Sequence, residues 1–110
     1  MKKLIKGFTL VEIMIVVAII GLLIAIALPN FLVARKRAQQ RSCVANLRQI
    51  DGAVSQLMTE GAVTNTLILA NLTPTYIKNA PTCKAGGSYT IVNNTNVTCS
   101  FTDTEYPHSL

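Results

Sequence analysis

Residues 8–28 read FTLVEIMIVVAIIGLLIAIAL, an apolar block whose single charged residue is Glu12. As a helix with a rise of 1.5 Å per residue, the block would be about 31 Å long, close to the hydrocarbon thickness of a bilayer. Backbone groups inside lipid must bond to one another, so we expect a membrane-spanning helix. The alternative is an ordinary secretory signal peptide, but the block is longer than a typical apolar signal region and no A-x-A-type cleavage site follows it cleanly.

The carboxylate of Glu12 is the informative feature of this block, because a charge inside lipid costs a few kcal/mol or more unless it is neutralised or paired. The block supplies no cation of its own. One interpretation is a protonated carboxyl group without a role. The other is pairing with an α-amino group at the start of the helix, which exists only if the chain is cut just before Phe8.

The residues around this cutting point carry a specific pattern. A basic leader, KKLIKG at residues 2–7, stands directly ahead of FTLVE at residues 8–12. The pattern resembles the class III signal sequence of type IV prepilins and type II secretion pseudopilins. The resemblance runs through Pro29 and weakens after about Arg41. It implies an α+β, pilin-like fold: one long N-terminal helix, its first half transmembrane, and a small C-terminal head with a short β-hairpin or small antiparallel sheet.

The resemblance also implies roles for individual residues. A prepilin peptidase would cut between Gly7 and Phe8, and Phe8 would then be N-methylated. Glu12 would pair with the Phe8 amino group of a neighbouring subunit in a homo-oligomeric filament. Gly21 and Pro29 match positions that bound a stretch able to lose helicity in the filament; glycine lowers helix propensity, and proline removes a backbone donor.

A protein of this kind is a structural subunit and not an enzyme, and nothing in the apolar block resembles a catalytic constellation. The precursor would cross the inner membrane once, and an assembly platform there would pass it into an extracellular or periplasmic filament. Pilus, secretion pseudopilus and competence filament stay open, as do a major and a minor role. A signal-anchored membrane protein that never polymerises is a further alternative. We expect no cofactor.

Beyond the block the helical pattern continues over residues 30–60 but becomes amphipathic. Apolar residues recur there at spacings of three and four, which defines one face of a helix. We expect this stripe to receive the head, and Gly61 to stop the helix. The stripe consists of Cys43, Leu47, Ile50, Val54 and Leu57. The predicted organisation is a cleaved leader over 1–7, a transmembrane and polymerisation helix over 8–29, its amphipathic continuation over 30–60 and a globular head over 61–110.

Strand and turn patterns in the head predict a hairpin. Segments 88–92 and 97–102 read as strands, and NNTN at residues 93–96 has the composition of a hairpin turn. A disulfide between Cys83 and Cys99 would close a loop of about 15 residues and contribute roughly 3 kcal/mol. The alternative is two free thiols. The third cysteine, Cys43, is a buried free thiol in one interpretation and a link between subunits in the other.

The net charge of +5 includes three leader lysines, Lys2, Lys3 and Lys6, so the basic pI describes a targeting segment more than a nucleic-acid partner. Further basic residues follow the apolar block. They suggest an alternative function, in which a minor pilin or competence pseudopilin binds DNA or a surface through its basic face or head. No aromatic residues interleave with these charges to stack on bases. The candidate contacts to DNA or lipid headgroups are Arg35, Lys36, Arg37 and Arg41.

The sequence gives little reason to expect a metal site. His108 is the single histidine, and no His/Cys spacing is of the zinc type. His108 with Asp103 and Glu105 could suggest a metal site, but a lone histidine and two carboxylates in a polar tail usually bind nothing. We therefore predict no metal.

Overall fold

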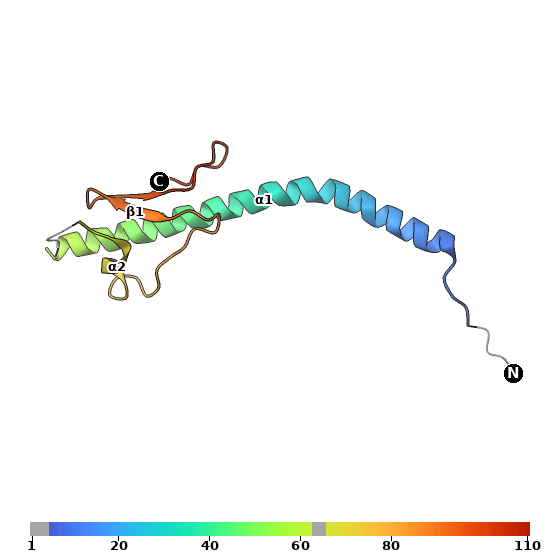
Figure 1. Cartoon of the computed structure of the whole chain (residues 1–110), viewed down its shortest axis with the longest axis horizontal. Coiled ribbons are helices and arrows are strands. Elements are labelled where there is room, and N and C mark those ends of the chain that lie inside the picture. Colours follow the sequence, from blue (N-terminus) through green and yellow to red (C-terminus); the bar gives the residue numbers. More distant parts are fainter. Residues whose placement is uncertain (1–4, 63–65) are drawn as a thin grey trace. The chain divides into compact units, whose positions relative to one another are not determined.

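A computed structural model describes residues 5–62 and 66–110; the leader lysines Lys2 and Lys3 lie outside the described residues. The predicted fold class is confirmed: one long apolar-to-amphipathic helix precedes a small antiparallel sheet (Figure 1). The chain divides into two compact units, of which the first ends at Ala34 and the second comprises Arg35–Leu110. The elements are α1 (Leu10–Thr59), α2 (Leu69–Leu72), β1 (Tyr89–Val92) and β2 (Asn96–Cys99).

Helix α1 begins at Leu10 with a reciprocal cap made by Thr9 and Glu12. The Thr9 hydroxyl oxygen accepts from the Glu12 backbone N–H at 3.3 Å, and the Glu12 carboxylate accepts from the Thr9 N–H at 2.9 Å. This Thr-x-x-Glu arrangement is a capping box, which satisfies backbone donors that a helix start leaves without partners. The structure thus gives Glu12 a local partner that the sequence interpretation did not consider.

The first unit leaves its apolar side chains on the surface. The apolar part of α1 is unburied, and by length and composition α1 is long and apolar enough to cross a membrane. Helix α1 runs without interruption through Gly21 and Pro29. Neither residue breaks the helix in the single chain, and their role in a melting segment of the filament stays a prediction.

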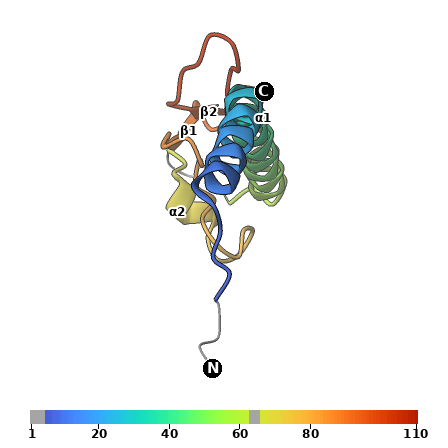
Figure 2. The ribbon, with the colours of Figure 1, turned by 90° about the vertical axis from the view of Figure 1, so that its right-hand side faces the viewer.

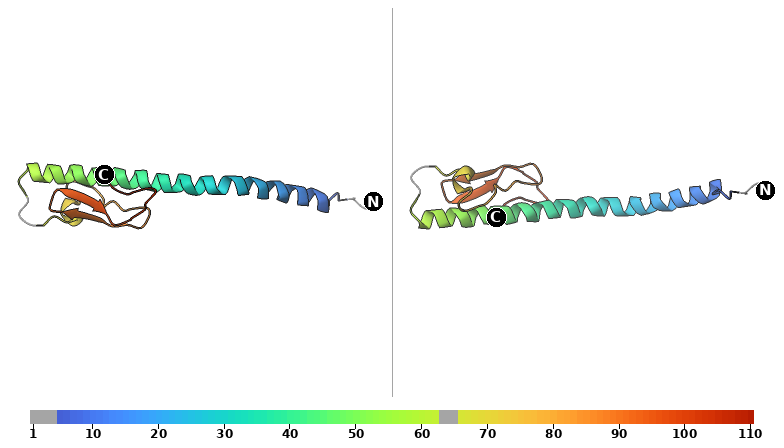
Figure 3. Two further views of the ribbon diagram at one scale, coloured as in Figure 1. Left: turned by 90° about the horizontal axis from the view of Figure 1, so that it is seen from above. Right: turned by 90° about the horizontal axis from the view of Figure 1, so that it is seen from below.

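In the second unit, the predicted stripe forms the core. Its five residues and Ala53 are buried, and side chains from the head close over them. Figures 2 and 3 show α2, the hairpin and the intervening loops along one side of the C-terminal part of α1. The helix ends at Thr59, and Gly61 follows with a φ of +67°, a left-handed conformation that favours glycine. The predicted stop at Gly61 is confirmed. The head side chains buried in this core are Leu67, Leu72, Ile77, Cys83 and Val97.

Strands β1 and β2 form the predicted hairpin, with Tyr89 opposite Cys99 and Val92 opposite Asn96. The turn contains Asn93 and Asn94, both with positive φ, which asparagine tolerates better than most residues. The second strand begins one residue earlier than expected and ends at Cys99 instead of Thr102. After Cys99 the chain leaves the sheet and returns toward α1.

Candidate functional site

The predicted cleavage site lies in an open segment ahead of α1. Residues 5–9 have no regular secondary structure. Apart from its chain neighbours, no atom of the described residues lies within 4 Å of the position that a Cβ on Gly7 would occupy, and Phe8 is 84% exposed. A peptidase needs accessible backbone, and this segment is exposed directly ahead of the apolar helix. Glu12 lies in the first turn of α1 and is exposed.

The four candidate basic residues are exposed on α1. Arg37 lies with its guanidinium 6.0 Å from the centre of the Tyr106 ring, in cation–π range. The neighbouring Gln40 donates from its amide to the backbone oxygen of Pro107 at 3.0 Å. This part of α1 therefore also holds the C-terminal tail, a use of Arg37 that the sequence did not indicate.

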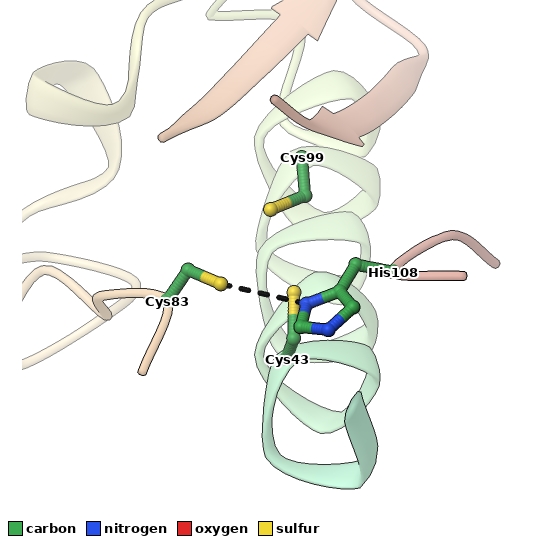
Figure 4. Close-up of side chains that lie close together, drawn as sticks. All are labelled: Cys43, Cys83, Cys99 and His108. Atoms are coloured by element: carbon green, nitrogen blue, oxygen red, sulfur yellow. Dashed lines mark hydrogen bonds between the residues drawn. The ribbon is translucent and has the colours of Figure 1, made fainter. Parts of the chain in front are cut away.

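The cysteines meet at one point of the second unit. Cys43, Cys83 and Cys99 each bring a sulfur, and His108 a ring nitrogen, to positions all within 4.8 Å of one another (Figure 4). The Cys83 sulfur lies 3.5 Å from His108 Nδ1. All three cysteines are free thiols here, so the predicted Cys83–Cys99 disulfide is not confirmed. Cys43 is fully buried, which supports the buried-thiol interpretation.

The surroundings of these thiols have opposite effects on their acidity. Burial raises the pKa of Cys43 to about 12. Burial also acts to raise the pKa of Cys83, but hydrogen bonds from the backbone of Ala85 and Gly87, and then from His108, lower it to about 7. The Cys83 loop therefore favours the thiolate. Burial, followed by the hydrogen bond with Cys43, raises the pKa of Tyr89.

Sequence reasoning missed this four-residue cluster. The ligand atoms come from α1, the loop before β1, the end of β2 and the C-terminal tail, so no short spacing reveals them. His108 faces Cys83 and not the carboxylates of Asp103 and Glu105: the Asp103 side chain instead accepts from the backbone N–H groups of Glu105 and Tyr106, at 2.9 and 3.2 Å. The usable signal was an odd cysteine count together with a single histidine.

An exposed segment, followed by a helix long and apolar enough to cross a membrane and by a small head, is the arrangement of a membrane-anchored protein. A sequence model of the family described as prokaryotic N-terminal methylation motif matches residues 2–28. Together with the relatives below, this match shows that the N-terminal part of the chain is similar to type IV pilins and to a type II secretion protein.

Three curated relatives show this similarity. The chain is 47% identical over 55 residues to the type IV major pilin protein PilA of Myxococcus xanthus, covering 50% of this chain and 25% of the relative. It is 44% identical over 61 residues to the type IV major fimbrial protein FimA of Dichelobacter nodosus, covering 56% and 39%. With the type II secretion system core protein G of Vibrio cholerae the identity is 35% over 65 residues, covering 57% and 44%.

The chain spans less than half the length of these relatives. No solved structure matches it significantly.

Proposed function

We propose that this chain is a structural subunit of a type IV pilus or a pilus-like pseudopilus filament. Prepilin peptidase cuts it between Gly7 and Phe8, and Phe8 is N-methylated. The main support is that the first part of α1 is apolar and unburied in the single chain. Before assembly, lipid covers this surface. The precursor is thus a single-pass protein of the inner membrane, and the assembly platform delivers it to an extracellular or periplasmic filament.

Burial of the apolar surface supplies the driving force for polymerisation. Each leucine, isoleucine or valine side chain moved from water to a dry environment contributes about 1.5–3 kcal/mol. The exposed large residues of this surface run from Leu10 to Val33. A filament core built from many copies keeps all of them dry outside the bilayer, whereas a lone chain outside the membrane would expose them.

Glu12 aligns neighbouring subunits in the filament. In the single chain its carboxylate caps α1 through the Thr9 N–H. Cutting after Gly7 creates a positively charged amino group on Phe8, one residue ahead of Thr9. In the filament, Glu12 pairs with the amino group of a neighbouring Phe8. The pairing compensates the cost of holding a carboxylate in an apolar environment.

Two substitutions of Glu12 separate pairing from capping. Glutamine can replace glutamate in a capping box but carries no charge, whereas alanine removes both features. We expect Glu12→Gln and Glu12→Ala both to be processed and both to lose most filaments, measured by electron microscopy and by the amount of subunit sheared from cells. Glu105→Gln, an exposed carboxylate of the second unit, is the control and should assemble normally. Wild-type filament yield from Glu12→Gln would show that the charge has no role in assembly.

The DNA- or surface-binding alternative has less support. Its candidate residues Arg35, Lys36 and Arg41 are exposed, but exposure alone is the ordinary state of basic side chains. Arg37 already lies over the Tyr106 ring. We therefore favour the structural role for the whole chain.

A further inference from the structure

The cluster of Cys43, Cys83, Cys99 and His108 has the composition of a metal site. Three sulfurs and one imidazole nitrogen within 4.8 Å of one another form a four-ligand set of the Cys3His type. Thiolates and imidazole are the ligands that zinc prefers in tetrahedral structural sites. Figure 4 shows the four side chains directed toward a common centre from separate segments of the chain. We propose that the second unit of this protein binds one Zn²⁺ through these four residues.

The distances fit a tetrahedral ion after a small contraction. With Zn–S near 2.3 Å and Zn–N near 2.0–2.1 Å, neighbouring ligand atoms of a tetrahedron lie about 3.5–3.8 Å apart. The Cys83 sulfur and His108 Nδ1 already stand at 3.5 Å. The remaining pairs of ligand atoms lie no further apart than 4.8 Å. Side-chain rotations that move these atoms by about 1 Å would therefore bring all four to bonding distance from one ion.

Burial also distinguishes these residues from a chance surface grouping. Cys43 is 0% exposed, Cys83 7% and His108 4%. Among the residues that the structure describes, His108 is the one buried side chain of the polar or charged class. A buried imidazole needs partners for its ring nitrogens. A zinc ion would take one of them and would explain why a histidine is placed against three thiols.

Polar side chains of α1 fix the two loop segments that carry ligands. The Gln39 amide donates to the backbone oxygen of Lys84, and the Asn46 amide to that of Thr82, on either side of Cys83. The Gln40 amide donates to the oxygen of Pro107, next to His108. Such outer contacts orient metal ligands in known sites.

A backbone turn also fixes the loop that carries Cys83. The Gly86 N–H donates to the Cys83 carbonyl at 3.1 Å, and Gly86 takes a φ of +99°, which favours glycine. This turn fixes the backbone immediately after Cys83, so it adds to the contacts that hold Cys83 in the cluster.

An ion can reach the cluster from solvent. A surface pocket lined by Cys99, Phe101, Thr102 and His108, among others, opens beside it. Binding would release the thiol protons, leaving three thiolates and a neutral imidazole on one Zn²⁺, with a net charge of −1. No change of oxidation state is involved. A disulfide would join only two of the four groups, and it would not account for the third thiol and His108 lying in the same cluster.

The test uses the full chain purified from membranes in detergent without reductant. Metal analysis should give one zinc per chain. The three thiols should resist alkylation by N-ethylmaleimide until the protein is denatured with a chelator, after which all three should react. One reactive thiol in a chain two hydrogens lighter would mean a disulfide and would overturn the proposal. Three thiols that react without chelator, in a chain that takes up no added Zn²⁺, would also overturn it.

Substitutions then assign the ligands. Cys83→Ser and His108→Gln should each weaken Zn²⁺ binding at least tenfold, whereas Ser109→Ala, an exposed neighbour, should leave it unchanged. Because loss of a ligand can unfold the head, His108→Cys serves as a second variant. It should keep one zinc per chain, and its Co²⁺ complex should gain sulfur-to-metal charge-transfer intensity over the wild-type complex. Unaltered Co²⁺ absorption in this variant would exclude His108 as a ligand.

Discussion

Gly87 is the position where adding one methyl group should disturb the head most. A Cβ built there would lie 2.7 Å from the Cys99 sulfur, 2.7 Å from the Phe101 Cβ and 2.9 Å from the Phe101 backbone nitrogen. Ordinary contacts between such atoms are about 3.5–4.0 Å. Two of the three atoms belong to, or are fixed to, the backbone of Phe101, so the loop and not a flexible side chain would have to move by about 1 Å.

Gly87→Ala should therefore lower the free energy of unfolding by about 1–3 kcal/mol, the usual cost of overpacking. In a unit of this size each kcal/mol shifts Tm by about 4–8 °C, so Tm should fall by at least about 4 °C. The assay is thermal unfolding of the full chain in detergent, followed by near-ultraviolet circular dichroism of the head tyrosines. The same variant should weaken Zn²⁺ binding, because it displaces the Cys99 sulfur.

Gly52→Ala is the matched control. Gly52 lies within α1, and a Cβ there meets nothing within 4 Å. Alanine in a helix interior is favoured over glycine by about 0.5–1 kcal/mol, so this variant should be slightly more stable than the wild type. If Gly87→Ala were as stable as Gly52→Ala, the close packing of the Cys83 loop against the end of β2 would be wrong.

Three further predictions concern the second unit. Leu47→Ala should cost about 2–5 kcal/mol because Leu47 is fully buried, whereas Met58→Ala, at an exposed position of the same helix, should stay within about 0.5 kcal/mol in urea unfolding. Tyr76→Phe should change stability little, because its hydrogen bond to Glu60 is on the surface. Hydrogen bonds from the backbone N–H groups of Glu105 and Tyr106 lower the pKa of Asp103 below 3.8. Their contribution to the stability of the folded state is therefore present above pH 3.8 and is lost as the pH falls through the lowered pKa. The protection of the Glu105 amide against hydrogen exchange, relative to its intrinsic rate at the same pH, should then fall, and Asp103→Ala should show the same loss of protection at neutral pH.

The sequence was sufficient for the helix, its core stripe and its end. An apolar period of three and four reports burial directly, so the five stripe residues from Cys43 to Leu57 were predictable. The hairpin followed from alternation and the asparagine turn. These features depend on neighbours within a few residues, where the sequence and the local structure are tightly linked.

The cap and the cysteine cluster could be predicted less well, for different reasons. Thr9 and Glu12 have the three-residue spacing of a capping box, which is visible in the sequence. The same glutamate also fits pairing with an amino group inside the membrane, so its identity alone does not indicate the cap. The cluster depends on the tail returning to α1 after β2, so that His108 meets Cys83 across 25 residues. Long-range closure of this kind leaves no periodic trace, and a disulfide was the natural interpretation of two cysteines near a hairpin.

We propose that cleavage after Gly7 converts a membrane-anchored chain into a filament subunit. The most direct test is mass spectrometry of the N-terminal peptide from filaments sheared off cells, with the membrane fraction measured in parallel. We expect the filament subunit to begin at Phe8 with one methyl group on its amino nitrogen, and uncut chain to occur only in the membrane fraction. Filaments whose subunits still carry residues 1–7, or begin at any residue other than Phe8, would contradict it.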